Sequence, residues 1–211
     1  MKNILALLAD WANGLFALLL ALYVTDTEIV WWYIPVALIL SHLPDVDAIP
    51  ELLQRGKVAA SAVHVKDHRT FLHYPIVSLV VCIIAWFTLG FWGVLICFSV
   101  ALHLLNDLYG SGWGLPVFWP VSSRHYKVLG RRVNWSKKDL VDAGMWGLVS
   151  GSERRLRLVV SWSEGEMPDY VKKWGIDNWV DGVYCKITWV SVVEYTAFIV
   201  AVGSMLVYFV Y

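Results

Sequence analysis

Long apolar segments constrain this chain more than any other feature of its sequence. An α-helix needs about 20 apolar residues to cross a bilayer, and five stretches approach that length, at residues 4–24, 29–43, 74–89, 91–109 and 188–211. Charged residues make up 16% of the 211-residue chain, whereas soluble domains average about 25%. The sequence therefore predicts an all-α fold, a multi-pass transmembrane helix bundle of about five spans with a Trp-rich cytoplasmic or peripheral segment.

The distribution of Lys and Arg predicts the orientation of the bundle. The links at residues 25–28 and at Gly90 carry neither residue type, whereas residues 50–72 and 110–186 carry all of them except Lys2. By the positive-inside rule, we expect the N-terminus and both charged segments to be cytoplasmic and the C-terminus to lie outside. The 17 basic residues are balanced by 17 acidic ones, so nucleic acid is not expected as a partner. The expected location is the cell (inner) membrane, in contact with membrane lipids.

Composition divides the chain into three regions. Residues 1–120 are expected to form the transmembrane bundle that carries a functional site, and residues 188–211 a C-terminal transmembrane helix. Between them, residues 121–187 form an amphipathic, Trp-rich segment, in which residues 152–160 have the pattern of a capped, basic, amphipathic element. Because Trp favours the headgroup level of a membrane, this segment is expected on the cytoplasmic surface; a small folded domain with Trp in its core is an equal alternative.

Three short motifs place His and Asp residues at predicted membrane boundaries. The first runs from His42 to Asp47 at the end of the second apolar stretch, where Pro44 is expected to end the helix. The second, at residues 67–73, precedes the third stretch, and the last, at residues 103–107, ends the fourth. The predicted orientation brings all three motifs to the cytoplasmic face, although they are far apart in the sequence.

These motifs supply donor atoms that suit a divalent metal ion. His103 and Asp107 are four residues apart, so they share one side of a helix, and ionisable groups within membrane segments are typically functional. Imidazole and carboxylate together favour zinc, with manganese or iron as alternatives, and the donors suffice for one ion or two. We predict as metal ligands Asp45, Asp47, His68, His73, His103 and Asp107, with His42 as a further ligand or as a residue that orients one.

Each motif alone also has a purely structural interpretation. His103 and Asp107 can hydrogen-bond each other across a buried helix face, and the two carboxylates after Pro44 can belong to a solvated turn. His68 can be an ordinary loop histidine. The metal hypothesis is favoured because the predicted topology gathers all of these residues at one face of the membrane.

The motifs resemble those of the membrane-bound metal-dependent hydrolases of the YdjM type, also described as LexA-binding, inner-membrane-associated hydrolases. The similar motifs are Pro-Asp-x-Asp at residues 44–47, His-Arg-x-x-x-His at 68–73, where the spacing is one residue longer than the commonest one in the family, and His-x-x-x-Asp at 103–107. Residues 112–120 look like the Gly-rich, Pro-ending stretch that follows in the family. The resemblance covers about the first 120 residues.

Two positions depart from the family pattern. Family members usually carry a His close to the N-terminus, which this chain lacks, so either Asp10 or His42 is implied to replace it as a ligand. A His often follows the second Asp of the first motif, where this chain has Ala48.

The resemblance implies a hydrolase, in which a metal ion lowers the pKa of a bound water from about 15.7 toward 7. A site at the interface suggests a phosphoester or lipid-linked substrate. Arg69 is then placed to bind phosphate bidentately, or to anchor a headgroup, while Asp67 orients His68. His64 and, more weakly, His125 are candidates for a general acid. The competing classes are a non-catalytic metal-binding membrane protein or transporter, and a membrane scaffold or regulatory protein.

Overall fold

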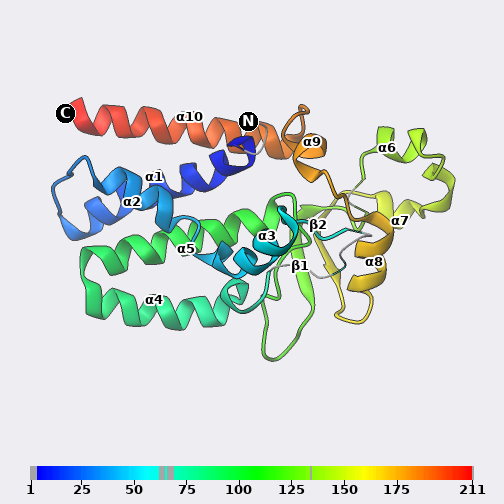
Figure 1. Ribbon diagram of the computed structural model, residues 1–211, viewed down its shortest axis with the longest axis horizontal. Helices are drawn as coiled ribbons and strands as arrows, with labels where there is room; N and C mark the ends of the chain where they lie inside the picture. The colour runs from blue at the N-terminus through cyan, green and yellow to red at the C-terminus, as the bar shows by residue number, and fades with distance from the viewer. Residues whose placement is uncertain (1–3, 62–64, 66–68, 134, 211) are drawn as a thin grey trace.

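The computed structural model describes residues 4–61, 65, 69–133 and 135–210. It has two parts, which we call the bundle and the lobe (Figure 1). The bundle consists of α1 (Ile4–Thr25), α2 (Tyr33–Leu40), η1 (Pro44–Ala48), α3 (Ile49–Arg55), η2 (Phe71–His73), α4 (Pro75–Leu89), α5 (Phe91–Tyr109) and α10 (Trp189–Val210). The lobe consists of β1 (His125–Gly130), α6 (Lys137–Asp142), η3 (Trp146–Leu148), α7 (Gly151–Arg154), β2 (Arg157–Trp162), α8 (Met167–Trp174) and α9 (Trp179–Val183).

Close helix packing around α1 organises the bundle. Helix α1 contacts α2, α5 and α10, and α4 packs against α5 (Figure 1). Glycines permit the closest approaches, because a Cβ atom on Gly14 would lie 2.6 Å from the carbonyl oxygen of Ala37, and one on Gly93 would lie 1.9 Å from that of Ala85. Small residues at helix contacts are typical of membrane proteins, where large apolar side chains gain little by leaving lipid.

Three of the described helices, α1, α5 and α10, are long and apolar enough to cross a bilayer. The predicted spans at residues 29–43 and 74–89 fold as the eight residues of α2 and the 15 residues of α4. At about 1.5 Å per residue, these two helices are about 12 and 22 Å long, less than the about 30 Å of a hydrocarbon core. The protein is therefore a mostly helical membrane protein with three candidate spans, and the number five stays a prediction.

The lobe contains an element that the all-α prediction lacked, a two-stranded antiparallel sheet. Strands β1 and β2 pair with His125 opposite Trp162 and Lys127 opposite Val160. The predicted amphipathic element at residues 152–160 is instead the short helix α7, capped by Ser150, followed by β2. A strand forms there because Val159 and Val160 are β-branched and because burial alternates at the end of β2, where side chains point to opposite faces.

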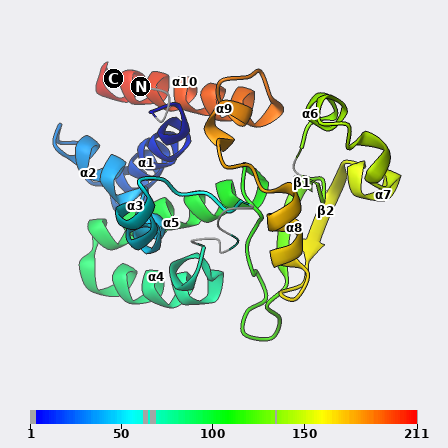
Figure 2. The ribbon, with the colours of Figure 1, turned by 45° about the vertical axis from the view of Figure 1, so that its right-hand side comes forward.

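Tryptophans form much of the core of the lobe. Trp162 is 0% exposed and meets the ring of Trp113 edge to face at 5.4 Å. Trp174 is also buried, and the Nε1 group of Trp135 donates a hydrogen bond to its carbonyl oxygen. Helices α6 and α7 lie on the side of the sheet away from α5 (Figure 2). The lobe is therefore folded around tryptophans, and its position relative to the membrane surface stays a prediction.

Candidate metal centre

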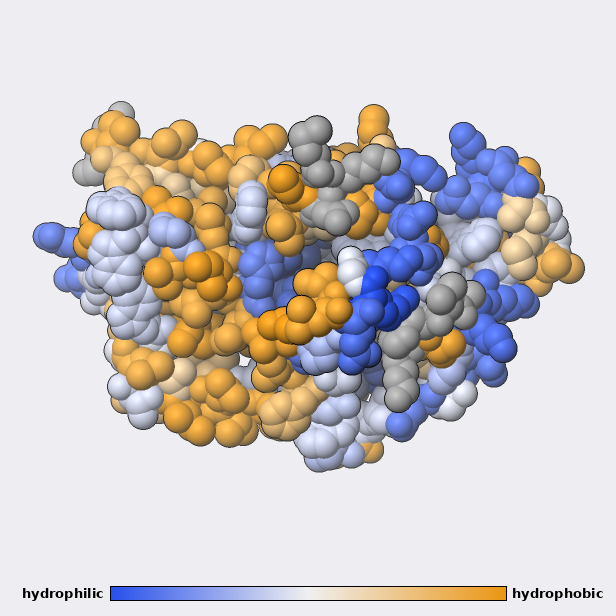
Figure 3. Space-filling view, viewed as in Figure 1, coloured by the Kyte–Doolittle hydropathy of each residue, from blue (hydrophilic) through white to orange (hydrophobic). Residues whose placement is uncertain are grey.

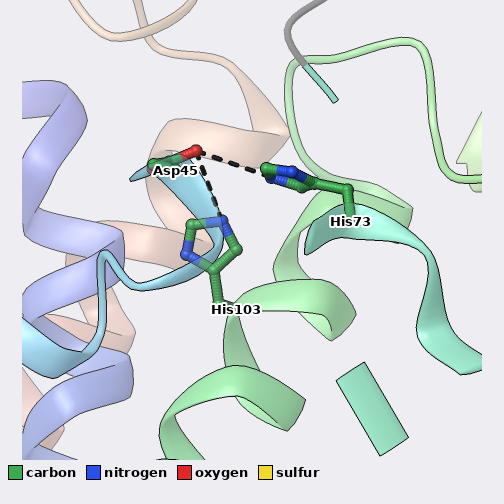
Figure 4. Close-up of side chains that lie close together, drawn as sticks. All are labelled: Asp45, His73 and His103. Carbon is green, nitrogen blue, oxygen red and sulfur yellow. Dashed lines mark ion pairs between the residues drawn. The ribbon is translucent and has the colours of Figure 1, made fainter. Parts of the chain in front are cut away.

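The three sequence motifs meet at the end of the bundle that adjoins the lobe. Helix α5 buries both His103 and Asp107 in its last two turns, as their spacing predicted. The turn η1 carries Asp45 and Asp47, and η2 ends at His73, which is 0% exposed. In Figure 4, His73 and His103 both point toward Asp45. We call Asp45, His73, His103 and Asp107 the His–Asp cluster.

Asp45, His73 and His103 each offer one ligand atom, and these three atoms lie within 4.8 Å of one another, while Oδ2 of Asp107 lies close to both imidazoles. Nε2 of His73 lies 3.5 Å from Oδ1 of Asp45 and 3.3 Å from Oδ2 of Asp107. Nε2 of His103 lies 3.6 Å from each of the same two oxygens. Within the described part of the chain, Oδ2 of Asp107 accepts no hydrogen bond although it is buried. Each imidazole nitrogen thus faces both carboxylates across a gap wider than most hydrogen bonds.

The outward nitrogen of each imidazole is fixed by an acceptor. Nδ1 of His103 lies 2.9 Å from the carbonyl oxygen of Ser41 and 2.9 Å from Oδ1 of Asp10. Nδ1 of His73 lies 3.1 Å from Oδ2 of Asp47. Carbonyl and ionised carboxylate oxygens only accept hydrogen bonds, so Nδ1 carries a proton in both rings. In the neutral rings, the lone pair is therefore on Nε2 and points into the cluster.

Asp47 is predicted as a ligand, but its described contacts are with the chain that precedes α4. Besides meeting His73, its Oδ2 accepts hydrogen bonds from the backbone nitrogen and from Oγ1 of Thr70, both at 3.1 Å. These contacts hold η2 against η1 and keep the ring of His73 aimed at the cluster. The sequence analysis did not single out Thr70 or the carbonyl group of Ser41, because neither residue type marks such a role in a sequence.

A second group of donors adjoins the cluster and shares Asp45 with it. Asp10, His42 and Asp45 each offer one ligand atom, and these three atoms lie within 4.8 Å of one another. Oδ2 of Asp10 is 3.6 Å from Nδ1 of His42. Both candidates for the missing N-terminal His are therefore beside the cluster, with Asp10 in direct contact with His103.

Arg69 is held against the opposite side of the cluster. Its Nε and Nη2 atoms donate to Oδ1 of Asp107 at 2.9 and 2.6 Å. Gly112 makes room for this guanidinium, since a Cβ atom there would lie 2.1 Å from Nη1 of Arg69. Gly114 has a φ of +74° and lies against the backbone of Tyr126 in β1. The Gly-rich stretch thus allows both Arg69 and the first strand of the lobe to approach the cluster closely.

A cavity of about 830 Å³ extends from the cluster toward the lobe. Apolar residues of α1 and α3, including Leu7 and Leu52, line part of it, and Arg69 and Lys127 line another part. In the space-filling view, hydrophilic residues appear in a hollow between the apolar bundle and the lobe (Figure 3). The cluster is therefore accessible, and the cavity that reaches it is both apolar and charged.

Lys127 is a residue of this cavity that the sequence analysis missed. It lies on β1, is 6% exposed, and its Nζ donates to the carbonyl oxygen of Gly112 at 2.9 Å. Burial and the nearby charge of Arg69 lower the pKa of Lys127 to about 7, although the charge of Asp107 acts in the opposite direction. A lysine within a short strand gives no sign in the sequence that its face is buried.

The carboxylates of the site act strongly on His73. Burial by itself would lower the pKa of His73, but attraction to the nearby carboxylates of Asp107, Asp45 and Asp47 outweighs burial and raises the pKa to about 10. In the absence of another cation, a proton on His73 therefore offsets part of the negative charge gathered here. A metal ion would fulfil the same electrostatic role.

The remaining predicted site residues are less informative. Asp67, His68 and His64 lie outside the described residues. His125 is the first residue of β1 and is not among the residues that line the cavity. Glu194 on α10 is 1% exposed, and its two carboxylate oxygens accept no hydrogen bond from any described residue. Its charge within an apolar span was the available signal that it is unusual.

These features define a membrane protein in which imidazoles and carboxylates gather where helix ends meet a folded lobe. The model of the YdjM inner membrane protein family matches residues 11–164, so the chain belongs to this family. The match confirms the resemblance inferred from the motifs and extends it through most of the lobe. No curated protein and no solved structure matches the chain significantly.

Proposed function

We propose that the protein is a membrane-embedded, metal-dependent hydrolase that acts at the cytoplasmic interface on a phosphoester or lipid-linked substrate. The observation that carries the proposal is the convergence of Asp45, His73, His103 and Asp107, with both outward imidazole nitrogens anchored. Buried His and Asp residues that only stabilised the fold would not require several donor atoms directed at one another. They would also not require a cavity that reaches them.

The spacing of the donors fits a zinc ion. Ligand atoms at about 2.0–2.2 Å from a tetrahedral zinc ion lie about 3.3–3.6 Å from one another, and the four separations between imidazole nitrogens and carboxylate oxygens are 3.3–3.6 Å. The buried Oδ2 of Asp107, which accepts no hydrogen bond from the described residues, gains a partner when a cation is present. Manganese and iron accept the same donor types.

The residues around the cluster have separate tasks in this proposal. Asp47 and Asp10 fix the tautomers of His73 and His103, and Arg69 fixes the carboxylate of Asp107. A divalent ion supplies Lewis-acid chemistry and lowers the pKa of a nearby water toward about 7. In the hydrolysis of a phosphoester, the water oxygen bonds to phosphorus, the bond from phosphorus to the leaving oxygen breaks, and the water proton ends on the leaving alcohol. His64 and His125 remain the sequence-based candidates for that proton transfer, and Asp67 the candidate that orients His68.

The proposed topology has five crossings with the cluster on the cytoplasmic side. Because Asp10 lies 3.6 Å from His42, residues 11–41 leave the cluster and return to it. The rings of His73 and His103 are 5.6 Å apart, so residues 74–102 do the same. The shorter helices α2 and α4 then serve as the return paths for α1 and α5. The Lys and Arg residues of the lobe favour its cytoplasmic placement.

Metal analysis of the purified full chain tests the proposal. We expect about one zinc ion per chain in the wild type, and below about one tenth of that in His103→Ala, because a tetrahedral site rarely survives loss of a ligand. The matched control is His125→Ala, which removes a histidine outside the cluster and should keep the ion. Retention of the wild-type metal content by His103→Ala, or its absence from the wild type, would contradict the proposal.

The number of ions and the activity complete this test. About two ions per chain, reduced to one by His42→Ala, would assign the second group of Asp10, His42 and Asp45 to a second ion. Hydrolysis of phosphoesters that disappears in both His103→Ala and Asp45→Asn supports the hydrolase. Stoichiometric metal without turnover of soluble or lipid phosphoesters would instead favour a metal-binding protein or transporter, and full function without metal would favour a scaffold.

A further inference from the structure

Lys127 is a buried lysine for which the described chain provides no paired anion. Its ammonium group has three donor hydrogens, and its described hydrogen bond uses one of them, to the carbonyl oxygen of Gly112 at 2.9 Å. No described carboxylate lies within ion-pair distance of Nζ, and the residue is only 6% exposed. A charge buried without a partner is strongly unfavourable, so an anion that entered the cavity would stabilise the charged form of Lys127 and use its remaining donor hydrogens.

Gly112 connects Lys127 to the His–Asp cluster. Its carbonyl oxygen accepts from Lys127, and its Cα faces the guanidinium of Arg69 so closely that a Cβ atom would lie 2.1 Å from Nη1. Arg69 in turn donates to Oδ1 of Asp107, whose Oδ2 faces both imidazoles of the cluster. Two cations on either side of one glycine therefore border the cluster and line the same cavity.

We propose that Lys127, assisted by Arg69, binds the phosphate group of the substrate beside the His–Asp cluster. This inference rests on the proposed function and specifies its substrate class. The two described hydrogen bonds of Arg69 both go to Asp107, so Arg69 mainly positions that carboxylate. Lys127 retains two donor hydrogens for phosphate oxygens, which are acceptors only. The sequence pointed to Arg69 as either a phosphate-binding residue or a headgroup anchor, and this proposal gives Lys127 the larger share of phosphate binding.

The phosphate group has two chemical sources, a lipid headgroup and a soluble phosphoester. The cavity favours the lipid, because Leu7, Ile49 and Leu52 line it along with the cations, and because Ile49 and Leu52 are each nearly half exposed at the surface of α3. An acyl chain on this apolar part would place its headgroup near Lys127. A soluble phosphoester would use the charged part alone.

Binding to the full chain in phosphatidylcholine nanodiscs, measured by calorimetry, tests the inference. The probes are dihexanoyl phosphatidic acid, inorganic phosphate and the neutral dihexanoylglycerol. We expect Lys127→Met to bind phosphatidic acid at least about tenfold more weakly, a loss typical of a buried charge contact, and Lys127→Arg to stay within about threefold of the wild type. The zinc content should not change in either variant. Binding by Lys127→Met at the wild-type affinity would overturn the inference.

The matched control is Lys57→Met. Lys57 lines the same cavity, but its ammonium group is paired with Asp177, so this variant should bind phosphatidic acid within about twofold of the wild type. If Lys57→Met loses as much affinity for phosphatidic acid as Lys127→Met, the binding depends on the overall positive charge of the cavity and not on Lys127. That result would overturn the inference. If Lys127→Met does not fold, Lys127→Gln replaces it, and binding by Lys127→Gln equal to that of Lys127→Arg counts against the inference.

The same measurements separate this inference from the proposed function. Zinc absent from the wild type overturns the hydrolase proposal, while a loss of phosphatidic acid binding in Lys127→Met still supports the phosphate site. Zinc present with no effect of Lys127→Met overturns only the phosphate site. Tighter binding of phosphatidic acid than of inorganic phosphate assigns the lipid source, and equal binding assigns the soluble one. Equally tight binding of dihexanoylglycerol and phosphatidic acid overturns the phosphate assignment.

Discussion

The bundle and the lobe differ in the side chains that they bury. In the bundle, the buried contacts of α1 combine small residues such as Ala17 and Ala21 with leucines such as Leu18, while Phe87 on α4 is 83% exposed and Ile199 on α10 is 70% exposed. In the lobe, Trp162 and Val171 are both 0% exposed. The space-filling view shows the corresponding surfaces, apolar over the bundle and largely hydrophilic over the lobe (Figure 3).

This contrast is the one expected for helices in lipid and a folded unit in water. Lipid removes the gain from burying large apolar groups, so helices in it associate through close contacts of small residues. Water restores that gain, and large aromatic side chains then dominate the core. The His–Asp cluster and the cavity lie where the two parts meet, which is where a substrate with an apolar chain and a charged head finds both environments.

Replacing the central tryptophan of the lobe gives the largest expected effect. Trp162→Ala should destabilise the lobe by about 3–5 kcal/mol, because it empties a fully buried site beside Trp113. Hydrogen exchange with mass spectrometry should show fast exchange in the peptides of β1 and β2, with the helices α1 and α5 still protected. The control is Trp31→Ala, since Trp31 is 74% exposed. Loss of protection throughout α1 and α5 would show that the bundle does not fold independently of the lobe.

A single added methyl group in the bundle should have the next largest effect. The Cβ atom of Gly93→Ala would lie 1.9 Å from the carbonyl oxygen of Ala85, so α4 and α5 must separate, at an expected cost of about 1–3 kcal/mol. Thermal unfolding in detergent measures this change. Gly203→Ala is the matched control, because nothing lies within 4 Å of its added Cβ atom. If both variants unfold at the same temperature, close packing does not stabilise this bundle.

The smallest expected effect concerns the polar surface of the lobe. The hydroxyl of Tyr170, with Ser150, lowers the pKa of Glu153 below its ordinary 4.5. A lowered pKa stabilises the folded state above about pH 4.5, and this contribution is lost as the pH falls through the lowered value. Glu153→Gln should therefore destabilise the lobe by about 1 kcal/mol at pH 7, and by less at pH 3.

Hydrogen exchange of the lobe peptides at several pH values measures this difference. Glu164→Gln, which changes an exposed glutamate of the same lobe, provides the control and should behave as the wild type throughout. A destabilisation by Glu153→Gln that is the same at pH 3 and pH 7 would show that the ionised carboxylate is not what stabilises this corner of the lobe.

The family and the nature of the site were predicted from local patterns. Hydropathy identified α1, α5 and α10, and the spacing of His103 and Asp107 placed both on the buried side of α5. Hydropathy did not predict the length of α2, because an apolar stretch records which residues avoid water but not how many of them are helical. It also gave no sign of the sheet, since six-residue strands in a charged region lack a distinct periodicity.

The sequence by itself determined that His and Asp residues lie at the ends of apolar helices, because charge and helical spacing are local properties of a chain. Only the tertiary structure decided which of these residues contact one another. It turned Asp47 toward His73 and Thr70, brought Asp10 to His103, and placed Lys127 in the cavity. These pairings join segments separated by tens of residues, so they depend on how helices and strands pack, which no local pattern records.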